Sequence, residues 1–110
     1  MAQIPFLDLR ASYLALQSDI DAAVARVLAS GWYIQSPELT DFEQAFAAYC
    51  GADHCVGVAS GLDALILSLR ALDLKQGDEV IVPSHTFIAT WLAVAAVGAV
   101  PIPVEPDANS

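Results

Sequence analysis

The spacing of apolar and polar residues changes several times along the chain, and each change marks a predicted element. In residues 11–29 the apolar positions recur at helical intervals, which predicts an amphipathic helix ended by Gly31. Ser36 and Pro37 occupy positions favoured at a helix start, so a second amphipathic helix is expected from there to Gly51. Two helices therefore precede the first predicted strand.

The second half of the chain alternates short apolar runs with helical stretches. Residues 55–59 and 79–83 are β-branched apolar runs and are predicted as buried strands. Between them, apolar residues at steps of three and four predict a helix that starts at Ser60. An almost wholly apolar helix is expected over residues 88–97. Residues 100–105 are predicted as a third strand, and their two prolines favour a sheet edge or a strand start.

This β-α-β-α-β order predicts an α/β fold with a parallel sheet, because parallel neighbours need a connection long enough to return over one face. Ligands of such sheets bind at the carboxyl ends of the strands, so the loops after the first two predicted strands matter most. We divide the chain into an N-terminal arm with two helices, residues 1–53, and the β-α-β-α-β unit, residues 54–110.

The loop after the first predicted strand has the features of a phosphate site. Ser60 can cap the next helix, with Asp63 in a capping-box-like relation, and Gly61 lets the backbone approach a ligand closely. The unpaired N–H groups of a helix start attract anions. Phe87, in the loop after the second strand, adds an aromatic ring at the same edge, which fits a flat phosphorylated cofactor. A purely structural helix start explains Ser60 and Gly61 equally well.

A third candidate is the unpatterned loop that holds Trp32 and Tyr33. Binding residues collect in loops, so these two side chains could line a site. Packing over the edge of the core is the alternative reading of both rings.

Charge and targeting signals narrow the classes of function. The formal charge is −9, with four basic and thirteen acidic residues, so a nucleic-acid or anionic membrane surface is not expected. The N-terminus lacks the pattern of a secretory signal, and no apolar run reaches the uninterrupted span of about 20 residues that crosses a bilayer. We therefore expect a cytoplasmic protein. Cys50 and Cys55 match no metal-ligand spacing, so no metal is expected.

The apolar content is high for a chain of this length. Hydrophobic residues make up 56% of the sequence, against about 45–50% in an average domain. Either the core is very deeply buried, or further sequence or a partner subunit covers the excess.

Several motifs, in order, resemble the N-terminal part of the DegT/StrS-type sugar-nucleotide aminotransferases. They are SGWYIQSPE at residues 30–38, SGLDAL at 60–65, GDEVIVP at 77–83 and HTFIAT at 85–90. The resemblance extends from Phe6 to Asp107. The motif sequences are most similar to those of members that aminate the 3-keto group of dTDP-hexoses. It implies the large domain of an aspartate-aminotransferase-like, fold-type I protein with pyridoxal 5'-phosphate (PLP) as cofactor.

The resemblance also assigns roles to residues. Backbone N–H groups at the helix start would hold the PLP phosphate, and an aromatic ring would stack on the pyridine. Family members often have Thr where this chain has Leu62, so a hydroxyl contact to the phosphate is absent. The cofactor-binding residues would be Ser60, Gly61, Leu62, Asp63 and Phe87. The substrate pocket would be bordered by Tyr33 and His85.

The activity implied is transfer of an amino group, typically from glutamate, to a keto-sugar nucleotide by a homodimer. This chemistry needs a lysine that forms a Schiff base with PLP and moves a proton. The only lysine, Lys75, precedes a strand and so lies opposite the ligand edge, as a surface residue. We therefore assign no catalytic residue and expect an inactive N-terminal piece of the enzyme. A PLP-dependent sugar dehydratase of the same family and a non-catalytic, stand-alone binding module remain open alternatives.

Overall fold

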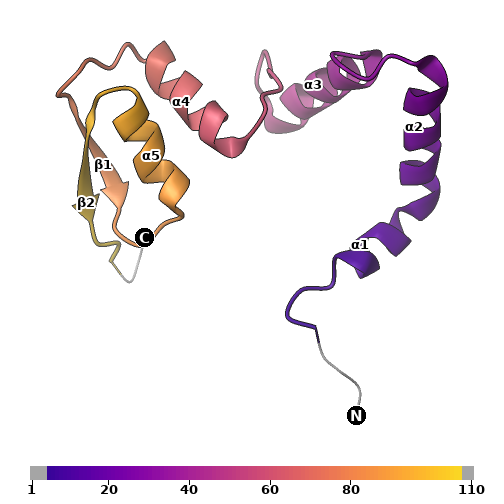
Figure 1. Cartoon of the computed structure of the whole chain (residues 1–110), viewed down its shortest axis with the longest axis horizontal. Coiled ribbons are helices and arrows are strands. Elements are labelled where there is room, and N and C mark those ends of the chain that lie inside the picture. Colours follow the sequence, from indigo (N-terminus) through magenta and orange to yellow (C-terminus); the bar gives the residue numbers. More distant parts are fainter. Residues whose placement is uncertain (1–4, 108–110) are drawn as a thin grey trace. The chain divides into compact units, whose positions relative to one another are not determined.

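The computed structural model describes residues 5–107, which form five helices and two strands (Figure 1). The chain divides into two compact units, one up to Val56 and one from Gly57. The first unit contains α1 (Leu9–Ala15), α2 (Gln17–Ser30) and α3 (Pro37–Cys50). The second contains α4 (Gly61–Ala71), β1 (Glu79–Pro83), α5 (Ile88–Ala96) and β2 (Val100–Val104).

The first unit has one helix more than the sequence pattern predicts. The single helix expected over residues 11–29 is broken at Leu16, whose φ of −120° and ψ of 15° separate α1 from α2. The prediction of one continuous helix was therefore wrong. Helical spacing of the apolar residues continues across the break, and neither glycine nor proline stands there, so the pattern carries no sign of it.

The predicted ends of α2 and α3 are confirmed. Gly31 and Gly51 follow the two helices with φ values of 68° and 67°, the left-handed conformation that glycine adopts without steric cost. Pro37 is the first residue of α3, as predicted. Ser36 holds the cap position, but its side chain makes no capping hydrogen bond, so only the position of the predicted cap is correct.

The second unit is a parallel β-α-β arrangement with one further helix. β1 and β2 pair in parallel, with Glu79 opposite Val100 and Pro83 opposite Val104. α5 connects the strands and packs against both of them, and α4 packs against α5 (Figure 1). The centre of this unit is formed by three buried residues with partly buried neighbours: Val82, Val94 and Ala99, surrounded by Leu69, Val80, Trp91 and Val97.

The strand expected at residues 55–59 is absent from the structure. A strand exists only when its backbone groups bond to a neighbour, and the sheet of the described residues consists of β1 and β2 alone. Val56 and Val58 are accordingly exposed rather than buried. The apolar, β-branched composition of this segment suits a strand, but composition does not supply a pairing partner.

The prolines of β2 lie on its free side. Val100 N–H donates to Asp78 O at 2.7 Å, and Ser84 N–H donates to Val104 O at 2.9 Å. Because successive residues of a strand face opposite neighbours, Pro101 and Pro103 alternate with the residues that bond to β1. The outer edge of β2 therefore lacks two N–H donors, which confirms the predicted sheet edge.

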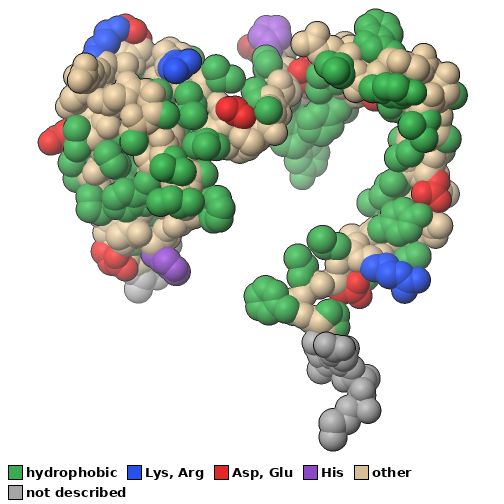
Figure 2. Space-filling view, in the orientation of Figure 1, with side chains coloured by type: hydrophobic (Ala, Val, Ile, Leu, Met, Phe, Trp, Pro, Cys, Tyr) green, Lys and Arg blue, Asp and Glu red, His purple; other side chains and the backbone are tan. Residues whose placement is uncertain are grey.

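Apolar side chains cover much of the surface of both units, as the green atoms in Figure 2 show. Among residues 5–107 the buried hydrophobic side chains are small ones: Ala47, Val82, Ala93, Val94 and Ala99. The apolar excess of the sequence is thus exposed instead of being packed in a deep core. Within the same residues, no helix combines the length and apolar character required to span a bilayer.

Candidate functional site

The start of α4 is built around Ser60 and Asp63. Ser60 has extended backbone angles, and its Oγ accepts a hydrogen bond from the Asp63 N–H at 3.1 Å. The same hydroxyl donates to Asp63 Oδ2 at 2.7 Å. In the usual capping box, the side chain three residues after the cap residue accepts a hydrogen bond from the backbone N–H of the cap residue. Here the carboxylate instead accepts a hydrogen bond from the Ser60 hydroxyl, so this side chain both donates and accepts within the cap.

This cap determines which N–H groups stay outside the helical ladder. The N–H of Ala64 donates to Ser60 O at 3.0 Å and begins the helical ladder, while the N–H of Asp63 is used by the cap. The N–H groups of Gly61 and Leu62 lie ahead of that ladder. Nothing lies within 4 Å of where a Cβ on Gly61 would stand, so a ligand can reach this backbone. The helix start therefore offers two N–H groups ahead of the helical ladder, with open space beside Gly61.

A groove of ≈ 570 Å³ lies between the starts of α4 and α5. Four of the predicted cofactor residues line it together: Ser60, Gly61, Leu62 and Phe87. Most of the remaining lining is aliphatic, contributed by residues such as Leu65 and Ile88. Phe87 leaves 78% of its surface exposed, so its ring is available to a ligand. The fifth residue, Asp63, is half-buried behind the cap.

The electrostatics of the groove come mainly from its two helix starts. α4 and α5 both begin there, and the partial positive charge of helix N-termini favours anions. Asp63 in the first turn of α4 is the opposing negative charge. The hydroxyls of Thr86 and Thr90 lie 3.2 Å apart at the start of α5. The arrangement suits a ligand with a small anionic group and a flat apolar body.

The other residues singled out from the sequence, His85, Tyr33 and Lys75, differ in their local surroundings. His85 is exposed in the loop after β1 and is not part of the groove wall. Tyr33 belongs to the first unit, where its hydroxyl donates to Leu28 O at 3.4 Å. Lys75 is exposed ahead of β1 and pairs with Asp73, which confirms its predicted surface position.

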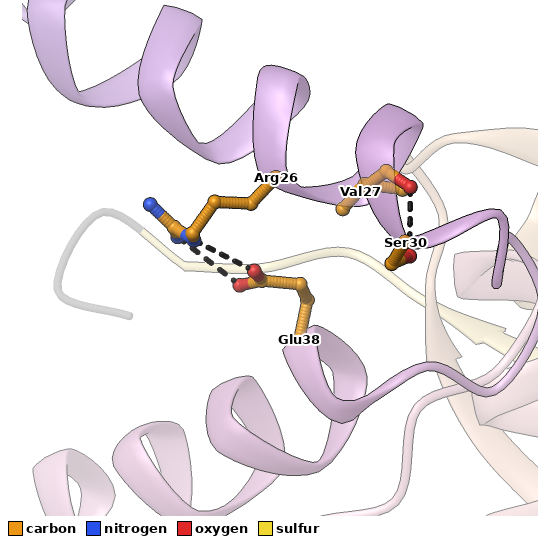
Figure 3. Close-up of polar contacts among 4 residues, drawn as sticks. All are labelled: Arg26, Val27, Ser30 and Glu38. Carbon is orange, nitrogen blue, oxygen red and sulfur yellow. Dashed lines mark hydrogen bonds and ion pairs between the residues drawn. The ribbon is translucent and has the colours of Figure 1, made fainter.

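One contact at the ligand edge was not anticipated from the sequence. Ser84 Oγ donates to Glu105 Oε2, which joins the residues that follow β1 and β2. The sequence could have indicated that these two residues lie close together, because the carboxyl ends of adjacent parallel strands meet at one edge of the sheet. The Arg26–Glu38 ion pair between α2 and α3 (Figure 3) was also missed, since twelve residues separate its partners.

The sequence profile of the DegT/DnrJ/EryC1/StrS aminotransferase family matches residues 15–110. The chain therefore belongs to this family. Its parallel α/β unit and the groove at two helix starts agree with the fold-type I domain that the motifs predicted.

Individual relatives are similar over nearly the whole chain. The erythromycin biosynthesis sensory transduction protein EryC1 of Saccharopolyspora erythraea is 68% identical over 107 residues, which are 97% of this chain and 29% of that protein. The dTDP-3-amino-3,4,6-trideoxy-α-D-glucose transaminase of Streptomyces venezuelae is 64% identical over 104 residues, 94% of this chain and 27% of that enzyme. The chain thus spans less than a third of the length of these relatives.

Solved structures agree with these similarities. The crystal structure of DesV from S. venezuelae matches 97% of this chain and 29% of its own, with a TM-score of 0.91 and 62% identity. NtdA from Bacillus subtilis, solved with bound cofactor PMP, matches 94% of this chain and 24% of its own, with a TM-score of 0.81 and 36% identity.

Proposed function

We propose that this chain is the N-terminal part of a PLP-dependent aminotransferase that transfers an amino group to a keto-sugar nucleotide. The observation that carries the proposal is the groove in which the start of α4 and the ring of Phe87 come together. Family membership and the S. venezuelae transaminase support the substrate class. Glutamate is the proposed amino donor, and a cytoplasmic homodimer is the proposed assembly.

The residues of the groove fit PLP. The N–H groups of Gly61 and Leu62 would hold the phosphate, and the open space at Gly61 allows it to approach. The Ser60 hydroxyl would support the cradle indirectly, since it is bonded in both directions to Asp63. Phe87 would stack on the pyridine ring, and Leu62 and Leu65 would keep water from one side of the cofactor.

The cofactor and the residues of this chain would have different roles in the reaction. Bound PLP would supply an electron-accepting pyridine ring and an aldehyde carbon that can carry the amino group between donor and acceptor. The described groove residues bind and orient it. Lys75 is exposed at the amino end of β1, whereas the groove lies at the starts of α4 and α5, and α5 follows the carboxyl end of β1. We therefore place the required lysine in sequence outside this chain, which by itself is expected to be inactive.

The sequence encoded after Ser110 is the first test. A lysine at the cofactor-linking position of a continuing reading frame would support the aminotransferase. A histidine there would favour a PLP-dependent sugar dehydratase of the same family. A stop codon directly after Ser110 would contradict an enzymatic role of this product and favour a stand-alone binding module.

A hybrid enzyme tests the groove itself. In this hybrid, residues 1–110 replace the corresponding segment of the S. venezuelae transaminase, which is 64% identical over 104 residues. We expect amino transfer to a dTDP-keto-sugar and PLP binding. Phe87→Leu removes the aromatic face and should weaken PLP binding about three- to ten-fold, while Phe87→Tyr keeps the face and should not. Equal affinities of the two variants would contradict the stacking role.

A further inference from the structure

The start of α5, at one side of the groove, lacks the usual capping contact. Phe87 is the N-cap residue, with φ of −67° and ψ of 142°, and its side chain makes no capping hydrogen bond. Serine, threonine, aspartate and asparagine are favoured at this position because their side chains accept a hydrogen bond from the first turn. A phenylalanine gives up this stabilisation, so the contacts of its neighbours matter more for this turn.

Two threonines bridge the position of Phe87. Thr86 precedes it and Thr90 lies in the first turn of α5, and their hydroxyl oxygens form a hydrogen bond of 3.2 Å. The N–H of Thr90 also donates to the carbonyl oxygen of Phe87 at 3.1 Å. The residue that carries the aromatic ring is thus held by a side-chain bond across it and by a backbone bond from the same turn.

The loop before Phe87 is also anchored where it begins. The N–H of Ser84 donates to Val104 O at 2.9 Å, which continues the pairing of β1 with β2, and the Ser84 hydroxyl donates to Glu105. In the sequence, only His85 separates Ser84 from Thr86. The segment from β1 to the first turn of α5 is therefore held at both ends, and a change in the threonine pair acts locally on Phe87.

The two threonines differ in their relation to the groove. Thr90 is half-buried and belongs to the groove wall together with Phe87 and Ile88, whereas Thr86 is exposed and is not part of the wall. One end of their hydrogen bond thus lies in the wall and the other end outside it. The bond can be removed from either end, and only a change at Thr90 alters the surface that a ligand would meet.

The backbone decides where the ring of Phe87 can lie. The side chain is 78% exposed, so its own packing contacts restrain it little. A side chain that must be ordered during binding costs entropy, and a fixed backbone reduces the number of positions that are lost. The hydrogen bonds around Phe87 therefore favour binding to its ring without touching the ligand.

We propose that Thr86 and Thr90 are positioning residues that hold Phe87 at the groove through their hydroxyl pair, and that they strengthen the binding of PLP in this way. The inference rests on the proposed function, in which Phe87 stacks on the pyridine ring. It adds that Thr90, although it lines the groove, acts on the cofactor through Phe87, since its hydroxyl is bonded to Thr86.

Valine and serine substitutions in the apo hybrid enzyme test the pair. Thr86→Val and Thr90→Val remove the hydroxyl at similar volume, and each should weaken PLP binding about three- to five-fold in an absorbance titration. The double variant should bind no more weakly than the single ones, because both break the same bond. Thr90→Ser keeps a hydroxyl and should retain most of the affinity. Unchanged affinity in both valine variants would overturn the inference.

Two comparisons separate positioning from other effects. Thr40→Val makes the same change at an exposed site of α3 and should leave the affinity for PLP unchanged. In a Phe87→Leu background no aromatic ring remains to be positioned, so Thr86→Val should have no further effect. An equal loss of affinity with and without the ring of Phe87 would overturn the inference, because the threonines would then act independently of it.

Fluorine NMR of the apo hybrid needs neither cofactor nor activity. The enzyme is labelled with fluorophenylalanine, and the Phe87 resonance is assigned by its loss in Phe87→Leu. Thr86→Val should shift or broaden this resonance, whereas Thr40→Val should not. An unmoved resonance would overturn the positioning role. A parent hybrid that shows the shift but binds no PLP would contradict the proposed function and support the positioning of Phe87.

Discussion

Ser60 and Asp63 bond to each other in both directions at the start of α4, through a 3.1 Å contact from the Asp63 N–H and a 2.7 Å contact to its carboxylate. The pair closes the helix start without using the N–H groups of Gly61 and Leu62. A short segment can therefore cap the beginning of a helix and leave these two N–H groups available to a ligand.

Replacing Ser60 by alanine should destabilise the start of α4. The variant loses the acceptor for the Asp63 N–H, and loss of such a cap costs about 1 kcal/mol. The free energy of unfolding of the hybrid enzyme in urea provides the measurement. Ser68→Ala removes the same hydroxyl from an exposed site of the same helix and should change stability little. Equal effects of the two substitutions would contradict the capping role.

Gly61 and Gly98 should respond differently to alanine. Gly98 has a φ of 82°, so a side chain there is strained although the nearest atoms lie 3.6 Å away. Gly98→Ala should cost about 1–2 kcal/mol of folding stability. Gly61→Ala meets open space and should leave unfolding nearly unchanged, but its methyl group would occupy the space through which we propose that the phosphate approaches.

The functional half of this prediction concerns PLP. We expect Gly61→Ala to weaken PLP binding by about ten-fold or more, because contacts of the phosphate to backbone N–H groups are lost. Titration of the apo hybrid with PLP, followed by absorbance, measures the affinity. Retention of full affinity in Gly61→Ala would place the phosphate elsewhere.

Truncation of Val94 should show where the core lies. Val94 is a residue of α5 that is only 2% exposed and packs in the core with Val82 and Ala99. Val94→Ala therefore removes buried methyl groups and leaves a void. We expect a loss of about 1–3 kcal/mol in the free energy of unfolding. Val104→Ala makes the same change at a residue that is 45% exposed and should cost less. A larger loss at Val104 would contradict the described packing.

Alkaline pH should loosen the junction between α1 and α2. The hydroxyl of Tyr13 donates to Asp21 Oδ1 at 2.9 Å across the break, and this bond raises the pKa of Tyr13 above its ordinary value. The protonated phenol is thus the form favoured by the folded junction. Its contribution is complete below the unfolded pKa of about 10 and is lost as the pH rises through the folded pKa.

Carbon-13 NMR of labelled tyrosine can follow this titration. Asp21→Asn removes the negative charge and should return the pKa of Tyr13 toward its ordinary value. An unchanged pKa of Tyr13 in this variant would show that the hydrogen bond does not form in solution.

Local signals in the sequence predicted several helix ends in both units correctly. Ser60, Pro37, Gly31 and Gly51 mark helix ends through chemistry that acts within a few residues, and the structure places the ends there. The parallel pairing of residues 79–83 with 100–104 followed from the length of the connection between them.

Predictions that depended on distant partners failed or were not possible. Residues 55–59 have the composition of a strand but no paired neighbour among the described residues. The break at Leu16 leaves the apolar spacing intact, and the Arg26–Glu38 pair joins two residues of α2 and α3 that are twelve positions apart in the sequence. In the groove, the sequence indicated which residues belong together but not that Asp63 would bind the Ser60 hydroxyl.

The prolines of β2 determine which edge of the sheet can pair with a further strand. A strand added beside β2 would find no N–H donor at Pro101 or Pro103 and would lose two ladder bonds, whereas the free side of β1 still offers the N–H groups of Glu79 and Ile81. A further strand is therefore expected to pair with β1 rather than with β2. The missing N–H groups of Pro101 and Pro103 also disfavour pairing of β2 with a strand from another molecule.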